Sequence, residues 1–224
     1  MPRQNHLVRG SAGHAVGVRR AFDLWSVPFG FYPDPMTDTP VSRPRITALQ
    51  MPIDWDRFGW PETPSIGDIV LTTGDPKWAW QPVAPVFEIH TMEPPHAMVV
   101  DGFTIDHVVL LVPSLDKAIA TLDRIGLTPR LRMEVKGRPA AFFRAGPVLE
   151  VVESPVRKAS LYGLAVTTDD PIESLAISWR SRDLSIGDIK PAIQPGRKIF
   201  TVHDLDAGFA VMSPDGPRSL KSQV

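Results

Sequence analysis

Two stretches of the chain repeat the same order of patterns, and this repeat restricts the fold more than any other feature. Residues 104–153 begin with the alternating run TIDHVVLLV, continue into the helix-like SLDKAIATLDRIG, and end in apolar runs around LRMEV, AAFFRAG and PVLEVVE. Residues 161–214 follow the same order from LYGLAVTT through DPIESLAISWRSRD to AGFAVMSP. Each unit reads as strand–helix–strand–strand–strand and is too small to bury its own sheet. We therefore expect an α+β fold in which two βαβββ modules, residues 104–154 and 160–214, form a curved mixed sheet with a concave cup inside and helices outside.

Cap residues mark the helix in each unit. Ser114 is the expected N-cap of the first helix, and Gly126, which tolerates a left-handed conformation, is its expected end. In the second unit Asp170, Pro171 and Glu173 predict an acidic capping box with proline at the first helical position. Both helices carry apolar residues at helical spacing, so each should have one face against the sheet.

The polar residues of the first unit have no counterparts in the second. Strand alternation places His107 and Glu150 each on a face with apolar neighbours. When the two units are aligned end to end, His107 matches Gly163 and Glu150 matches Ala210. The first unit alone offers an imidazole and a carboxylate to the cup.

The composition excludes several classes of function. Lysine and arginine number 24 and aspartate and glutamate 25, for a net charge of −1, so we expect no nucleic-acid partner. No apolar run approaches the ~20 residues of a membrane span, so we expect no membrane partner and a cytoplasmic protein. The chain has no cysteine, which excludes disulfides, thiolate nucleophiles and Cys-ligated zinc. Any metal site must use His, Asp and Glu, which suit Zn, Mn, Fe, Ni or Mg.

Proline and tryptophan divide the chain near residue 103. Most of the 24 prolines and all but one of the 6 tryptophans precede this position. We expect residues 1–45 to be a disordered or non-native leader, with Met36 as an alternative start. Residues 46–103 should form a strand-and-loop extension, rich in proline and tryptophan, that packs against the repeat domain at residues 104–218.

The repeat resembles the vicinal oxygen chelate superfamily, which includes glyoxalase I, bleomycin-resistance proteins, methylmalonyl-CoA epimerase and extradiol dioxygenases. The similarity lies in IDHVVLLVPSLDKAIATLDRIGLTP and PVLEVVES of the first unit and extends over residues 104–214. It implies paired βαβββ modules forming a cup that often holds a divalent metal, with ligands from the first and last strands of the modules. By this resemblance His107 matches the first-strand histidine and Glu150 the last-strand glutamate. The second unit departs from the pattern at Gly163 and Ala210.

The pair in the first unit allows two kinds of chemistry. If they face one cup, His107 and Glu150 could bind a divalent metal jointly, with water or substrate in the remaining positions. Without metal, an apolar cup would raise the pKa of Glu150 and suit it as the catalytic group for proton abstraction next to a carbonyl. The alternative is that the two side chains only form a hydrogen bond with each other and have no role in function.

Other side chains are candidates to complete a ligand set. Glu88 and His90 share a strand face, and Glu93 and His96 follow in TMEPPH. If this segment crossed the cup, His90 would be a third ligand. His203, in FTVHD of the second unit, is a further candidate by its location. The ordinary alternative for each histidine is a place on the surface.

Three arginines of the first unit are candidates to hold an anionic substrate. They are Arg130, Arg132 and Arg144, which lie in or beside its strands. Exposed charges also serve to block edge pairing of sheets, so a solvated edge is the alternative.

Three functions remain open from the sequence. The first is a glyoxalase-like enzyme, a metal-dependent lyase, isomerase or dioxygenase, acting on a small-molecule substrate at His107 and Glu150. The second is a metal-free protein of the bleomycin-resistance type that binds or sequesters a small ligand, because aromatic and apolar walls favour such binding. The third is a structural or regulatory module. A homodimer that brought two first units together would supply two copies of each residue and complete a four-ligand set.

Overall fold

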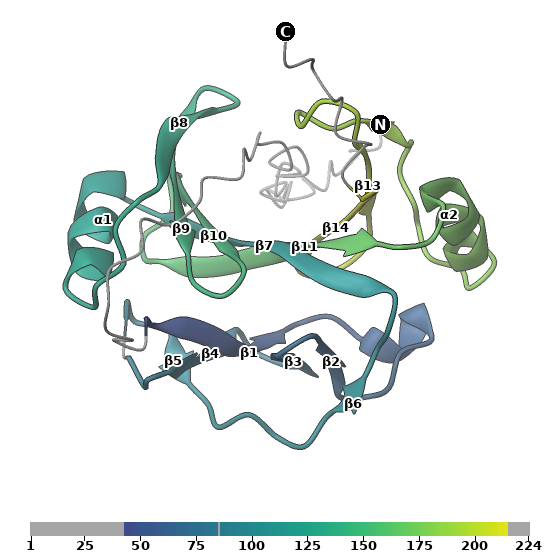
Figure 1. Ribbon diagram of the computed structural model, residues 1–224, viewed down its shortest axis with the longest axis horizontal. Helices are drawn as coiled ribbons and strands as arrows, with labels where there is room; N and C mark the ends of the chain where they lie inside the picture. The colour runs from purple at the N-terminus through teal and green to yellow at the C-terminus, as the bar shows by residue number, and fades with distance from the viewer. Residues whose placement is uncertain (1–42, 85, 215–224) are drawn as a thin grey trace, which may run out of the picture.

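The computed structural model describes residues 43–84 and 86–214 and consists of two stacked sheets (Figure 1). Most of the predicted leader, residues 1–42, lies outside the described residues. The repeat forms the upper sheet in this view, and the segment before it forms the lower sheet. No helix of the described ranges is long and apolar enough to cross a membrane.

The two repeat units build one eight-stranded sheet in the order β12-β13-β14-β11-β7-β10-β9-β8. The first module comprises β7 (Phe103–Val112), α1 (Leu115–Asp123), β8 (Leu131–Val135), β9 (Arg138–Arg144) and β10 (Val148–Glu153). The second comprises β11 (Ser160–Thr168), α2 (Ile172–Arg180), β12 (Lys190–Pro191), β13 (Lys198–Val202) and β14 (Gly208–Met212). The predicted α+β fold of two βαβββ modules is therefore confirmed.

The register of the central strands relates the two modules residue by residue. β7 and β11 pair antiparallel, and each pairs in parallel with the last strand of its own module, β10 or β14. His107 stands two residues before the β7 residue that pairs with Glu150. Gly163 stands two residues before the β11 residue that pairs with Ala210. The equivalences inferred from the sequence therefore hold in the sheet.

The eight-stranded sheet is curved and has two different faces. In Figure 1 β8 and β13 rise at its two ends, and α1 and α2 lie outside them. The outer face packs against both helices and the N-terminal sheet in one continuous apolar core. A second, smaller apolar cluster covers the concave face and draws on seven strands: Val109, Leu111, Val135, Ala140, Phe142, Val152, Ala165, Ile199, Ala210 and Met212. We call this set the concave-face cluster.

The segment before the repeat forms a six-stranded sheet in the order β5-β4-β1-β3-β2-β6. Its elements are β1 (Arg45–Met51), the 3₁₀ helix η1 (Trp55–Phe58), β2 (Pro64–Ile66), β3 (Ile69–Thr73), β4 (Lys77–Gln81), β5 (His90–Thr91) and β6 (Met98–Val99). Trp55 and Trp60 reach the repeat domain, with ring centroids 5.9 and 6.1 Å from that of Phe209. These tryptophans therefore contribute to the contact between the two sheets.

The helices begin differently from the sequence-based prediction. Ser114 stands at the N-cap of α1, but its hydroxyl makes no capping bond; Glu153 Oε2 instead accepts from the backbone N–H of Leu115 at 2.8 Å. Pro171 occupies the N-cap of α2, one residue before the helix, so the predicted capping box is wrong. The carboxylate of Glu173 pairs with the ammonium of Lys198, because β13 lies within its reach.

Candidate functional site

His107 and Glu150 meet on the concave face of the sheet. They come from the neighbouring parallel strands β7 and β10. On its strand, each lies on the same face as members of the concave-face cluster. His107 Nε2 lies 3.5 Å from Glu150 Oε2, and the two side chains are 5% and 0% exposed. Neither oxygen of Glu150 accepts a hydrogen bond from the described residues. A buried carboxylate without hydrogen-bond donors is costly in its ionised form.

A β-bulge brings a second carboxylate to the same histidine. Ala165 of β11 pairs with His107 and Val166 pairs with Ile105, so Asp106 is the extra residue on β7. Strict alternation would turn Asp106 away from its neighbour, whereas a bulge re-aims the side chain. Asp106 Oδ2 lies 2.7 Å from His107 Nδ1.

An arginine from the second module completes this network. Arg197 precedes β13, and its Nη1 donates to Asp106 Oδ1 at 2.8 Å. Its Nη2 donates to Thr167 Oγ1 of β11 at 2.7 Å. The order Arg197, Asp106, His107, Glu150 therefore alternates cation and anion when the imidazole is protonated.

The network shifts the pKa of each titratable member. Burial acts to raise the pKa of Asp106, but the hydrogen bond and charge of His107 and the charge of Arg197 outweigh it and lower this pKa to about 2. Burial acts to lower the pKa of His107, but Asp106 and Glu150 raise it overall. Burial raises the pKa of Glu150 to about 7, although the charge of His107 opposes this. Glu150 therefore exchanges its proton near neutral pH.

Two donors from one chain do not make a complete metal site. Catalytic zinc sites use three protein ligands as a rule, and the described residues contain no group of three or more His, Asp or Glu side chains that could hold an ion. A ligating histidine must also be unprotonated, whereas the raised pKa of His107 favours the imidazolium. Metal binding by His107 and Glu150 remains a prediction, and the described side chains around the pair supply no third ligand.

The equivalent position in the second module is sterically closed. A Cβ atom added at Gly163 would lie 2.1 Å from the carbonyl oxygen of Gly208 on β14. No side chain fits there unless the backbone of β14 moves. The absence of a side chain at Gly163 is therefore required by the packing of β11 on β14.

The structure separates the other predicted ligands from this pair. His90 lies in β5, an edge strand of the N-terminal sheet that pairs with β4, and is exposed. Its segment does not cross the cup, so the ordinary alternative, a histidine on the surface, holds for His90. Glu93 and His96 follow in the exposed connection to β6. His203 lies directly after β13, where its backbone N–H donates to Ser185 at 2.7 Å.

The three predicted anion-binding arginines are exposed at the end of the sheet. Arg132 Nη1 lies 3.9 Å from Asp116 Oδ1, and both side chains are more than half exposed. Arg130 precedes β8 and Arg144 ends β9. Their role in binding an anionic substrate remains a prediction.

Sequence reasoning missed Asp106, Thr167 and Arg197. Alternation assigns Asp106 to the other face, and only the bulge reverses this. Arg197 stands in a polar run that reads as a turn, 91 positions from its carboxylate partner. The nearest signal in the sequence is the adjacency of Asp106 and His107, because a carboxylate beside a histidine often orients the ring.

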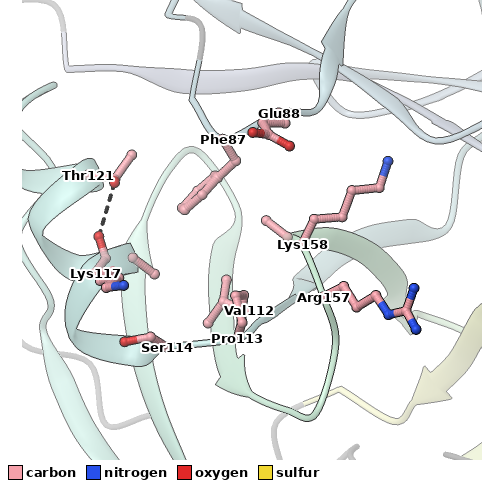
Figure 2. Close-up of a pocket in the computed structure, with 11 residues that line it drawn as sticks. Phe87, Glu88, Val112, Pro113, Ser114, Lys117, Thr121, Arg157 and Lys158 are labelled. Carbon is pink, nitrogen blue, oxygen red and sulfur yellow. Dashed lines mark hydrogen bonds between the residues drawn. The ribbon is translucent and has the colours of Figure 1, made fainter.

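A cavity of about 250 Å³ lies on the outer side of the sheet, at the start of α1 (Figure 2). Figure 2 shows the ring of Phe87 pointing into it, Lys117 on the α1 side, and Arg157 and Lys158 on the opposite side. Its wall includes Val112, whose side chain belongs to the outer-face core. The cavity is therefore separate from the His107–Glu150 pair.

Comparison with solved structures identifies the class of fold. Methylmalonyl-CoA epimerase from Mycobacterium tuberculosis matches at 16% identity and a TM-score of 0.44, over 54% of this chain and 95% of the epimerase. A xylose isomerase-like TIM barrel/4-hydroxyphenylpyruvate dioxygenase fusion protein matches at 12% identity and a TM-score of 0.50, over 78% of this chain and 50% of the fusion protein. A glyoxalase I mutant from Zea mays matches at 13% identity and a TM-score of 0.40, over 78% and 70%.

The match to the fusion protein shows a likeness of fold over most of this chain. The sheet is built from two βαβββ modules, as the resemblance in the sequence implied. No protein-family model matches the sequence, and no curated protein matches it. At identities this low the likeness concerns the fold alone.

Proposed function

We propose that the protein is an enzyme that moves a proton on a small carbonyl compound bound against the concave face, with Glu150 as the proton acceptor. The observation that supports this proposal most directly is the burial of Glu150, with both oxygens lacking a hydrogen-bond donor among the described residues. A carboxylate held in this way is a stronger base than one in water. Its pKa of about 7 suits a group that must take up and release a proton near neutral pH.

The proposed step conserves charge and atoms. The Glu150 carboxylate removes a proton from the carbon next to the carbonyl, and the C–H electron pair moves to the carbonyl oxygen to give an enolate. His107, protonated and held by Asp106, is the nearest cation that can stabilise the developing charge. Return of the proton from Glu150, after the enolate has turned its other face toward this residue, inverts the carbon and gives an isomerase. Alternatively, the enolate electrons expel a leaving group from the next carbon, which departs with its electron pair, and this gives a lyase.

The metal-free binding protein is retained as the second candidate. The concave-face cluster is almost entirely aliphatic and aromatic, which favours an apolar ligand. In this alternative His107 and Glu150 would contact the ligand without reacting with it. A metal-dependent reaction would require ligands beyond the two described here, for example from a homodimer. In such a homodimer the two β7 strands could not pair with each other, because each β7 already pairs with β10 and β11.

Deuterium exchange tests the proposed function without knowledge of the substrate. Pyruvate, acetylacetone and a 2-methyl-branched acyl thioester are each incubated with the protein in D₂O, and loss of the α-proton is followed by ¹H NMR. We expect at least one probe to exchange faster with the wild type than with Glu150→Gln, by about 100-fold or more. The rate should increase as the pH rises through about 7, because the carboxylate is the active form.

A matched variant controls for the loss of a carboxylate in general. Glu134 lies on β8 and is exposed, so Glu134→Gln should exchange at the wild-type rate. Equal rates for wild type and Glu150→Gln on every probe would contradict the proposal. Saturable binding of an apolar fluorescent probe, abolished by Phe142→Ser on the concave face, would then support the binding protein. Stoichiometric metal lost on His107→Ala would instead support the metal-dependent enzyme.

A further inference from the structure

Arg197 is a buried cation that links the second module to the histidine of the first. Its side chain is 6% exposed. Each of its three nitrogens donates to a different element: Nε to the carbonyl oxygen of Ser213 at 2.9 Å, Nη1 to Asp106 at 2.8 Å, and Nη2 to Thr167 at 2.7 Å. The planar guanidinium can satisfy these acceptors together only in one orientation. Its position is therefore fixed by the sheet.

Asp106 divides its two oxygens between Arg197 and His107. Oδ1 accepts from Arg197 and, at 3.3 Å, from the hydroxyl of Thr167. Oδ2 lies 2.7 Å from His107 Nδ1. Because Arg197 holds Oδ1, rotation of the carboxylate is restricted and Oδ2 is directed at the imidazole. With Nδ1 as the donor to Asp106, Nε2 is the ring nitrogen that faces Glu150.

We propose that Arg197 is a positioning residue for the proton-transfer pair: through Asp106 it fixes the ring orientation of His107 and keeps a proton on Nδ1. This inference rests on the proposed function for its role in activity, but the geometry it predicts can be measured separately. The second module, which lacks the ligands of the first, thereby supplies part of the first module's site.

The alternative is that Arg197 only braces the sheet. It joins residues of β7 and β11 to the segment after β14, and such a bond can stabilise the fold without any effect on His107. Arg197→Met would then lower the melting temperature but leave the imidazole as it is. A measurement on the imidazole itself distinguishes the two roles.

NMR of the full chain with ¹⁵N-labelled histidine provides this measurement, with the His107 signals assigned from His107→Gln. In the wild type we expect a low-field Nδ1–H resonance that is protected from exchange with water by Asp106. In Arg197→Met this resonance should disappear, because Asp106 becomes free to turn. Proton exchange on a reactive probe should fall by about 100-fold, as a misplaced group costs a factor of this size.

The adjacent lysine gives a matched control. Lys198 follows Arg197 directly as the first residue of β13, but its ammonium pairs with Glu173 on the surface. Lys198→Met also removes a cation that links β13 to another element, without contact with Asp106. The His107 Nδ1–H resonance of Lys198→Met should match that of the wild type. Persistence of the resonance in a folded Arg197→Met would overturn the proposal.

Asp106→Asn tests the same inference if Arg197→Met does not fold. The amide has one acceptor oxygen, so it can accept from Arg197 or from His107 but not from both. If Arg197 sets the orientation, the oxygen turns to Arg197 and the amide NH₂ faces His107. Nδ1 then has no acceptor, so the imidazolium loses its Nδ1 proton and keeps only the proton on Nε2. The ¹⁵N shifts report whether Nδ1 has lost its proton. A His107 that keeps its Nδ1 proton in this variant would refute the positioning role.

The two proposals fail in different ways. Absence of exchange on every probe, with the resonance lost in Arg197→Met, would reject the proton-transfer function and keep the geometric role of Arg197. A resonance that persists in Arg197→Met, with Glu150-dependent exchange intact, would reject the positioning role and keep the function.

Discussion

At the scale of single residues, the chemistry of the molecule depends on which charges are buried and which are paired. Asp106 is paired with two cations, whereas the imidazole is the one charged partner of Glu150 among the described residues. Burial therefore raises the pKa of Glu150, while pairing lowers that of Asp106. Two carboxylates that contact one histidine thus differ in their protonation at neutral pH.

This difference predicts how stability depends on pH. The folded-state pKa of Glu150 is raised from 4.5 to about 7, so the folded protein binds more protons than the unfolded chain between these values. The free energy of unfolding should therefore fall as the pH rises through this window, by about 3 kcal/mol from Glu150. Urea unfolding at pH 5 and pH 8 measures this slope. It should be shallower in Glu150→Gln and unchanged in the exposed variant Glu134→Gln.

At acid pH the expected direction is the opposite. The pKa of Asp106 is lowered from 3.8 to about 2, so its ion pairs stabilise the protein above pH 4. This contribution should be lost as the pH falls from about 4 to about 2.

For the prediction on Glu150, a wild-type slope between pH 5 and 8 that equals that of Glu150→Gln would show that Glu150 is not buried in the folded protein.

At the scale of elements, the pairing of β11 with β14 leaves no room for a side chain at Gly163, the counterpart of His107. Gly163 and Gly208 lie side by side, and the absence of side chains allows the two strands to approach closely. The corresponding strands of the first module, β7 and β10, carry His107 and Val148 at these positions. The asymmetry of the repeat is therefore an asymmetry of strand packing as well as of sequence.

Gly163→Ala should be strongly destabilising for this reason. The added methyl group would lie 2.1 Å from the carbonyl oxygen of Gly208, a backbone atom in the middle of the sheet. We expect a loss of about 3 kcal/mol or more in the free energy of unfolding, since overpacking against backbone cannot be relieved by a rotamer change. Gly67→Ala is the control: it has open space around it, and its positive φ of 56° should cost about 1 kcal/mol. Equal losses for the two variants would show that β11 and β14 can separate.

At the scale of the whole molecule, the N-terminal sheet and the repeat domain share one core. The main apolar cluster runs from Leu49 and Trp78 of the lower layer to Phe200 and Phe209 of the upper one. Trp60 packs edge-on against Phe103, with ring centroids 5.0 Å apart. This continuity indicates that the two layers unfold together.

Trp60→Ala should destabilise both layers at once. Removal of a buried tryptophan costs about 3–5 kcal/mol in a protein core, and here the cavity would open between the sheets. Far-UV circular dichroism and intrinsic fluorescence should report a single transition at a lower urea concentration. Val83→Ala, at a side chain that is 82% exposed, should leave the transition unchanged. Two separate transitions in the wild type would contradict the shared core.

The sequence by itself determined the modular fold and the common face of His107 and Glu150. Strand alternation and helix periodicity are local properties, so the order of elements and the shared face of His107 and Glu150 followed from them. The helix caps were less accurate, because the side chain that caps α1, Glu153, comes from β10 and not from the helix itself.

Only the tertiary structure decided what surrounds that pair. A bulge of one residue turned Asp106 toward His107, and the fold of the second module brought Arg197 to it. Strand pairing placed His90 on the other sheet and closed the space at Gly163. Each of these outcomes depends on the register between strands far apart in the chain. Local alternation predicts which residues share a face, but a bulge and the contacts between distant strands arise only when the sheet assembles.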